Sequence, residues 1–175
     1  MDMDFIKEID AKVSPIQYGW VDHDGTKYTD MSQYAEKYIL QAPDQLLKSC
    51  LGVCWDQVEL QRKLFANAGV TTRSFFIVHY DEDKCPTHTF TIFEYGGKTF
   101  WYEHAWTIMR GLHEYDNLRS AVSDIRDKFI QNELNDKYNP QNLVIYEYKK
   151  PPYGLSCSEF YKHCEKGQKV KISSL

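Results

Sequence analysis

The sequence predicts a mixed fold of helices and strands within one domain that spans residues 1–175. Three observations support this prediction. Apolar residues recur at helical spacing in several segments, three consecutive segments between residues 71 and 106 are rich in β-branched and aromatic residues, and Gly96-Gly97 separates the last two of them. The chain has 175 residues, of which 42% are hydrophobic, and this is enough for one sizeable core.

The first helix is expected over residues 4–13, where the apolar residues follow a helical period. Ser14-Pro15 should end this helix, because proline does not continue one. Residues 16–28 are expected to form an irregular strand or loop, since they include the turn signal Asp24-Gly25.

Two helices are predicted in the next part of the chain. Pro43 suits the first turn of a helix through Leu47, and Gly52 interrupts it before a second helix from about residue 53 to 68. The second helix carries apolar residues on more than one face, so we expect it to be buried against several elements. Cys54 lies in its first turn.

Three strands are predicted after this central helix. Residues 71–80 are β-branched and aromatic, and residues 81–86 form a polar turn. Residues 87–95 and 98–106 flank Gly96-Gly97, a dipeptide that readily adopts the positive φ angles of a two-residue hairpin turn. The two segments should therefore form a β-hairpin.

The remaining elements lie in the C-terminal part of the chain. A helical period predicts a helix over about 118–134, and alternation predicts a strand over 143–148. Pro151-Pro152 breaks the chain afterwards. The run Ser156-Cys157-Ser158-Glu159 matches a capping box, so a short helix should extend to about Cys164.

The predicted hairpin also fixes which side chains meet. A two-residue turn at Gly96-Gly97 places Phe90 opposite Glu103 and His88 opposite Ala105, and all four project from one face of the sheet. His88 and Glu103 become diagonal neighbours. Diagonal pairs lie about 7 to 8 Å apart at the backbone, a gap that two long side chains can close to a hydrogen bond.

Cys54, His88 and Glu103 are the candidate catalytic residues. Nucleophilic catalysis by cysteine needs a thiolate, an imidazole that moves the proton, and a third group that orients the imidazole. Cys54 begins a helix, where unpaired N–H groups and the helix dipole favour an anion. The three residue types therefore predict a thiolate paired with an imidazolium.

An oxyanion site is expected beside the thiol. The backbone N–H of Cys54 is one candidate donor, and a side chain from the segment between Gln17 and Trp20 is the second. We assign Gln17 and Trp20 to oxyanion or substrate contacts.

These residues resemble the transglutaminase-like superfamily, in which a nucleophilic cysteine begins a central helix and the next strands carry His and Asp. The resemblance covers about residues 45–106, with further helices and strands added on both sides. The segments with His88 and Glu103 occupy the places of the two strands. Glu103 stands where Asp is typical. The resemblance implies an α+β, papain-like fold, in which the helix carrying Cys54 packs on an antiparallel β-sheet.

The resemblance also implies acyl transfer through a thioester on Cys54. We expect hydrolysis of a peptide, isopeptide or side-chain amide, because water is always present as an acceptor. The expected partner is a protein, peptide or amide substrate. Superfamily members include transglutaminases, proteases, amidases and proteins that have lost catalysis, so the resemblance leaves the reaction open.

Three alternatives remain. A catalytically silent domain of the same fold would use the groove around Trp20, Cys54 and Trp106 to hold a peptide or protein. A transglutaminase would resolve the thioester with an amine. An acyltransferase that uses a thioester donor such as coenzyme A needs a pocket for a phosphorylated carrier, and the sequence contains no phosphate-binding glycine loop or basic cluster.

No cofactor or metal is predicted. His79, Cys85 and His88 are possible metal ligands, but a structural zinc site generally has four ligands in paired clusters and no convincing fourth is present. The hairpin register places His104 on the face opposite His88, where a packing role is expected.

The charge and cysteine content of the chain bear on its partners and on its location in the cell. The net charge of −4 and the lack of a dense Lys/Arg tract argue against a nucleic-acid partner. No apolar run is long enough to cross a membrane, and the acidic N-terminus is unlike a signal peptide. Five cysteines are an odd number, so reduced thiols and a cytoplasmic location are expected.

Overall fold

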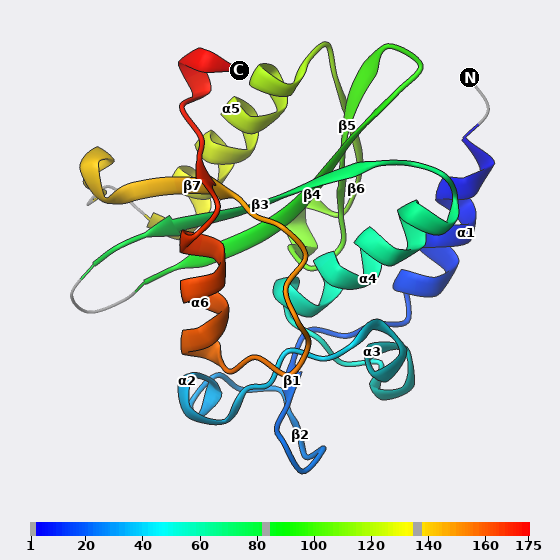
Figure 1. Ribbon diagram of the computed structural model, residues 1–175, viewed down its shortest axis with the longest axis vertical. Coiled ribbons are helices and arrows are strands. Elements are labelled where there is room, and N and C mark those ends of the chain that lie inside the picture. Colours follow the sequence, from blue (N-terminus) through cyan, green and yellow to red (C-terminus); the bar gives the residue numbers. More distant parts are fainter. Residues whose placement is uncertain (1–2, 82–84, 135–137) are drawn as a thin grey trace.

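A six-stranded antiparallel sheet forms the centre of the protein. The computed structural model describes residues 3–81, 85–134 and 138–175. The strand order is β6-β5-β4-β3-β7-β8, and every neighbouring pair is antiparallel (Figure 1). The strands are β3 (Thr72–His79), β4 (Thr87–Tyr95), β5 (Lys98–Glu103), β6 (Gly111–Tyr115), β7 (Leu143–Glu147) and β8 (Gln168–Lys169). With helices packed on this sheet, the fold is α+β, as predicted.

Helices cover both faces of the sheet. The long helices are α1 (Asp4–Val13), α4 (Cys54–Asn67), α5 (Leu118–Phe129) and α6 (Cys157–Glu165), and α2 (Tyr34–Lys37) and α3 (Pro43–Ser49) are shorter. Phe76 and Val78 pack into a buried cluster with residues of α4 and α6, whereas Phe75 and Ile77 pack into another with α5. Alternation along β3 therefore separates the α4 side from the α5 side.

Smaller elements complete the chain. β1 (Trp20–Val21) and β2 (Lys27–Tyr28) form a separate two-stranded sheet, and a π-helical turn (Ile130–Leu134) follows α5. Within the described residues, short 3₁₀ turns are formed by Thr107–Met109, Pro140–Asn142 and Ile172–Ser174. No helix among the described residues has the length and apolar character needed to span a membrane.

The hairpin register agrees with the prediction. β4 and β5 pair from Tyr95 opposite Lys98 to Thr91 opposite Tyr102, with a two-residue connection between them. Both glycines of this connection have positive φ, +57° at Gly96 and +80° at Gly97. The pattern is that of a type I′ hairpin turn, whose twist matches that of the strands.

Several boundaries differ from expectation. β5 ends at Glu103 rather than continuing to Trp106, because the Glu103 carboxylate accepts a hydrogen bond from the Trp106 N–H and turns the chain. Residues 111–115, where the sequence predicted no strand, pair with β5 as strand β6. The helix predicted over 118–134 ends as an α-helix at Phe129 and continues as the π-helical turn.

The polar turn predicted over 81–86 lies partly outside the described residues. Asp81, Cys85 and Pro86 are described, whereas residues 82–84 are not. All five cysteines carry free thiols, with Cys54 and Cys164 buried.

Candidate active site

Cys54 is the first residue of α4, and the residues around it fix the start of this helix. Val53 is extended, and its N–H donates to the Asp56 carboxylate at 3.0 Å. Asp56 is fully buried and also accepts from the Tyr38 hydroxyl at 3.0 Å and the Gln41 N–H at 2.9 Å. Burial raises the pKa of Asp56 to about 7, although these hydrogen bonds oppose the shift. Asp56 thus caps the helix that presents the thiol.

The Cys54 side chain lies at the helix end that favours an anion. It is 5% exposed. N–H groups in the first turn of a helix lack acceptors within that helix, so the Cys54 N–H is directed away from the helix body. The helix dipole adds a positive field at the same place. A thiolate and a nearby oxyanion are both favoured by this position.

His88 and Glu103 meet as the hairpin register predicts. His88 Nε2 and Glu103 Oε2 are 2.8 Å apart, and both side chains are buried. The other Glu103 oxygen accepts from the Trp106 N–H at 2.8 Å. Both carboxylate oxygens are therefore held, which fixes the direction in which Glu103 presents its charge to the imidazole.

The imidazole of His88 also contacts the Cys54 thiol. Burial lowers the pKa of His88, but the Glu103 carboxylate and a hydrogen bond with Cys54 outweigh it and raise the pKa to about 10. Because Nε2 is engaged by Glu103, Nδ1 is the ring nitrogen available to the thiol. Burial would raise the pKa of Glu103, yet the charge and hydrogen bond of His88 hold it below its usual value. The structure thus brings together Cys54, His88 and Glu103.

We expect Glu103→Gln to destabilise the protein in a pH-dependent manner. The raised pKa of His88 contributes stability that is present below its unfolded value of 6.5 and is lost as the pH rises through about 10. The lowered pKa of Glu103 contributes stability that is present above its unfolded value of 4.5 and is lost as the pH falls through its folded value. The difference in unfolding free energy between wild type and Glu103→Gln should therefore be largest between about pH 4.5 and 6.5.

Urea unfolding of the two proteins across this pH range measures the difference. Glu94→Gln, on the exposed end of β4, is a matched control for removal of one carboxylate. A difference for Glu103→Gln that stays constant from pH 6 to pH 10 would show that no charged pair is present.

A second hydrogen-bonded chain joins the sheet to the loop before Cys54. Gln57 Oε1 and His104 Nδ1 are 2.8 Å apart, and Gln57 Nε2 donates to the Gly52 carbonyl at 2.9 Å. Burial and the nearby Arg110 lower the pKa of His104, which favours the neutral ring. His104 therefore has a packing role on the α4 side, as the register predicts, whereas the positioning role of Gln57 was not predicted.

The segment around Gln17 runs beside the loop that precedes Cys54. The Gln17 N–H donates to the Cys50 carbonyl at 2.9 Å, and the Gly52 N–H donates to the Gln17 carbonyl at 3.0 Å. The Gln17 backbone is thus fixed near the thiol, but its side chain is exposed. Its predicted contact with an oxyanion stays a prediction.

Trp20 is a core residue. It is fully buried, its indole stacks on Tyr28 with centroids 4.1 Å apart, and its N–H donates to the Asp30 carbonyl at 2.7 Å. The N–H predicted for an oxyanion or substrate is therefore already used. The segment that the sequence indicated lies beside the loop before Cys54, but the indole of Trp20 is buried within the core.

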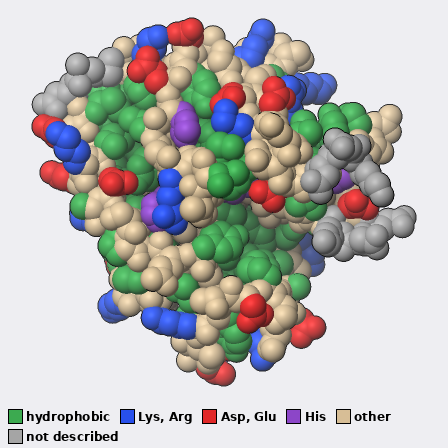
Figure 2. All heavy atoms as spheres, turned by 180° about the vertical axis from the view of Figure 1, so that it is seen from behind, with side chains coloured by type: hydrophobic (Ala, Val, Ile, Leu, Met, Phe, Trp, Pro, Cys, Tyr) green, Lys and Arg blue, Asp and Glu red, His purple; other side chains and the backbone are tan. Residues whose placement is uncertain are grey.

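Tyr18 is the residue of this segment that borders the site. The residue is 45% exposed, but burial, followed by the charge of Cys54, raises the pKa of its hydroxyl far above the usual value. Tyr18 borders a cleft of about 400 Å³ that reaches His88. The cleft is lined by Tyr18, Thr87, His88, Ala105, Trp106, Thr107, Ile108 and Glu133. Hydrophobic side chains are exposed over the middle of the face shown in Figure 2.

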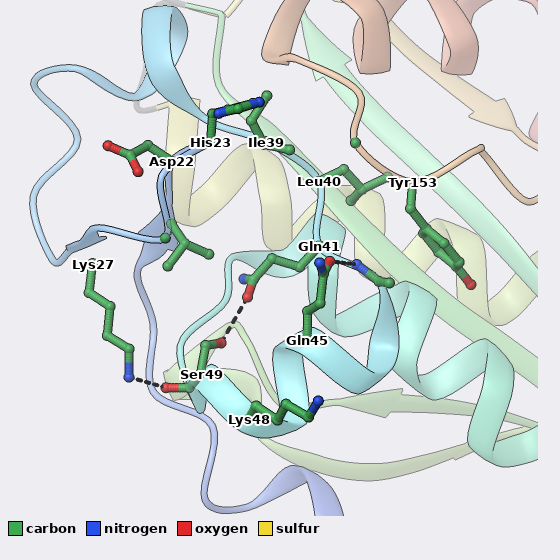
Figure 3. A pocket seen from close by; sticks show the side chains of 14 residues that line it. Asp22, His23, Lys27, Ile39, Leu40, Gln41, Gln45, Lys48, Ser49 and Tyr153 are labelled. Carbon is green, nitrogen blue, oxygen red and sulfur yellow. Dashed lines mark hydrogen bonds between the residues drawn. The ribbon is translucent and has the colours of Figure 1, made fainter.

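A second, larger pocket of about 710 Å³ lies between the β1–β2 sheet and α3 (Figure 3). Lys27 and Gln41 line it, and both already bond to the protein, Lys27 to the Ser49 carbonyl and Gln41 to the Leu51 carbonyl. None of the three candidate catalytic residues lines this pocket. The smaller cleft is therefore the one associated with the candidate catalytic residues.

Within residues 3–81, 85–134 and 138–175, no group of three or more His, Cys, Asp or Glu side chains is placed to hold a metal ion. The sequence matches no model of a protein family, and a comparison with curated proteins finds no significant match.

Proposed function

We propose that the chain is a cysteine-dependent acyl-transfer enzyme that hydrolyses an amide through a thioester on Cys54. The observation that carries this proposal is the position of His88 between the Cys54 thiol and the Glu103 carboxylate. A nucleophile, a proton-transfer group and an orienting group are the components that covalent acyl transfer requires. The substrate class we infer is a peptide, isopeptide or side-chain amide.

The same arrangement supports a papain-like core of the transglutaminase-like type. The helix that begins with Cys54 packs on an antiparallel sheet, and His88 and Glu103 lie on consecutive strands of it. The extra methylene of Glu, relative to Asp, does not prevent contact, since the carboxylate reaches the imidazole at 2.8 Å. The replacement of Asp by Glu is therefore compatible with an intact triad.

The reaction follows from the protonation states of these groups. The Cys54 thiolate attacks the amide carbonyl, and the His88 imidazolium gives its proton to the departing amine as the C–N bond breaks. A thioester remains on Cys54. His88, now neutral, takes a proton from water, whose oxygen attacks the thioester and releases the acid and the thiolate. Glu103 stabilises the imidazolium and fixes its orientation throughout.

Two donors are available for the oxyanion of the tetrahedral intermediate. The Cys54 N–H at the helix start is the first. The Tyr18 hydroxyl is the second, because it lies near the thiol and its raised pKa keeps it protonated. This assignment places the side-chain donor on Tyr18, between the two residues that the sequence indicated.

We expect Tyr18→Phe to slow acyl transfer by about a hundredfold to a thousandfold, because loss of one oxyanion donor typically has an effect of that size. The rate of Cys54 alkylation by iodoacetamide should stay within about twofold of wild type, since alkylation forms no oxyanion. Comparison of the two rates in the same variant is the measurement. Equal losses in both would mean that Tyr18 affects the thiol rather than the intermediate.

A trapped acyl-enzyme tests the proposed function. The protein is incubated with peptides that carry glutamine side-chain amides, C-terminal amides or internal peptide bonds, quenched in acid and weighed intact. We expect an acyl adduct that hydroxylamine removes and that is absent in Cys54→Ala. Cys85→Ala, which removes an exposed thiol, should retain the adduct. Hydrolysis that continues unchanged in Cys54→Ala would contradict the proposal.

The proposed function also has an acyl acceptor and a location in the cell. We infer water as the acceptor, and addition of methylamine to the assay would reveal transamidation as a methylamide product. The five free thiols are compatible with a reducing compartment, and we infer a cytoplasmic location on that basis.

A further inference from the structure

We propose that the cleft beside His88 selects substrates that carry a positive charge, a primary ammonium or guanidinium group, close to the scissile amide. The inference rests on the proposed function for its biological meaning. It concerns the lining of the cleft, which is independent of whether catalysis occurs. The occupant we infer is an amide, such as a peptide, with an apolar segment next to a lysine-like or arginine-like group.

The walls of the cleft offer apolar surface to a substrate. Trp106 lies beside the imidazole, with the two ring centroids 5.1 Å apart. Ile108 follows in the 3₁₀ turn and is 68% exposed, the highest value among the exposed large hydrophobic residues that the structure describes. Tyr18 borders the cleft as well. Three apolar or aromatic surfaces thus surround the catalytic imidazole and can contact the hydrocarbon part of a substrate.

Among the described residues that line the cleft, Glu133 is the carboxylate, His88 is the cation, and none is lysine or arginine. The Glu103 carboxylate, 2.8 Å from the imidazole, balances the charge of His88, so Glu133 leaves this part of the site with a net negative charge. After burial, the groups that act most on the Tyr18 hydroxyl are Cys54, Glu133, Asp56 and Glu103, all of them acidic. An anionic substrate group would be repelled here, whereas a cation beside Glu133 would be attracted.

The larger pocket provides a contrast within the same molecule. Lys27, Lys48 and His23 line that pocket, with Asp22 as its carboxylate, and Figure 3 shows these side chains around it. The acidic character of the cleft is therefore a local property that does not follow from the net charge of −4 alone.

Charged thiol reagents test the inference without any substrate. In a methanethiosulfonate reagent, the thiolate of Cys54 attacks the sulfenyl sulfur, forms a disulfide and releases methanesulfinate. We would measure the rate at Cys54, resolved by peptide mass spectrometry, for the 2-aminoethyl and 2-sulfonatoethyl reagents. The ratio of the two rates reports the sign of the local charge.

We expect the ratio of the rate with the cationic reagent to the rate with the anionic reagent to be higher at Cys54 than at the exposed Cys50. Glu133→Gln should lower the ratio at Cys54 by about threefold to tenfold, the effect of one charge several ångströms away near a protein surface. Glu8→Gln, on the exposed side of α1, makes the same charge change outside the cleft and should leave the ratio unaltered. An unaltered ratio in Glu133→Gln would overturn the inference.

A neutral reagent separates the two proposals. Methyl methanethiosulfonate should react with Cys54 at the same rate in wild type and Glu133→Gln, because it carries no charge. Failure of the proposed function would appear as a thiol of ordinary reactivity toward this reagent with the charge ratio still intact. Failure of the present inference would appear as a highly reactive thiol with no dependence on Glu133.

Discussion

Replacement of His88 by alanine should slow the alkylation of Cys54 by iodoacetamide at pH 6 by about two orders of magnitude. An ordinary thiol with a pKa of about 8.5 is thiolate to only about 0.3% at pH 6. In the wild-type protein the pKa of His88 is raised to about 10, so the imidazolium persists at pH 6, and the proposed function pairs it with a Cys54 thiolate. Without the imidazole, Cys54 should return toward ordinary reactivity.

Peptide-resolved mass spectrometry of the alkylated protein provides the rate at Cys54 alone. Cys54→Ala defines the background from the other four thiols, of which Cys50 and Cys85 are exposed. His88→Gln, which fills more of the space left by the ring, guards against an effect of a cavity. Alkylation at pH 6 that is as fast in both His88 variants as in wild type would rule out the thiolate-imidazolium pair.

Replacement of Trp55 by alanine should lower the free energy of unfolding by about 3 to 5 kcal/mol, the range observed for removal of a buried aromatic ring. Trp55 is 2% exposed and stacks on Phe160 with centroids 4.3 Å apart. Tyr38 and Tyr161 meet its edge or face at 5.4 and 5.5 Å. Its ring therefore connects the first turn of α4, next to Cys54, to α6.

Urea unfolding measures the loss, and Trp55→Phe is the matched control because it retains one ring against Phe160. We expect the Phe variant to lose less than half as much stability as the Ala variant. Equal losses of stability in the Phe and Ala variants would mean that a phenyl ring stacked on Phe160 contributes nothing, and that the stabilising contacts come from the part of the indole that phenylalanine lacks. A loss of less than about 1 kcal/mol for Trp55→Ala would contradict the described core.

The hairpin, with the pair His88 and Glu103, was the most predictable part of this protein. Gly96-Gly97 sets the turn and alternation sets the face, and together they predict from the sequence alone that His88 and Glu103 are neighbours. The residues that set the turn and the face are close in sequence, since His88 to Glu103 spans only sixteen residues. The start of α4 at Cys54 was predictable for the same reason, since Gly52 marks the break before it.

Contacts between distant segments were harder to predict. β6 has a sequence, Gly-Leu-His-Glu-Tyr, without a strong strand signal, and it becomes a strand because it pairs with the edge of β5. Gln57 lies three residues after Cys54 and belongs to no sequence motif that indicates a role. Its side chain is positioned by a hydrogen bond with His104, the residue that follows β5.

The choice among neighbouring side chains also depends on packing. Trp20 and Tyr18 lie two residues apart and both carry a hydrogen-bond donor. The sequence could not tell that the Trp20 indole stacks on Tyr28 and bonds to the Asp30 carbonyl, whereas Tyr18 borders the cleft. Only the position of the β1–β2 sheet makes this distinction.

The protonation state of His88 tests the central claim most directly. Nitrogen-15 NMR of labelled protein distinguishes imidazolium from neutral imidazole, and a His88→Gln spectrum assigns its signals among the six histidines. We predict that His88 is protonated on both nitrogens at pH 8, loses its proton near pH 10, and titrates lower in Cys54→Ala, where the thiolate is missing. A neutral His88 at pH 8 that titrates near 6.5, unchanged by Cys54→Ala, would contradict the account.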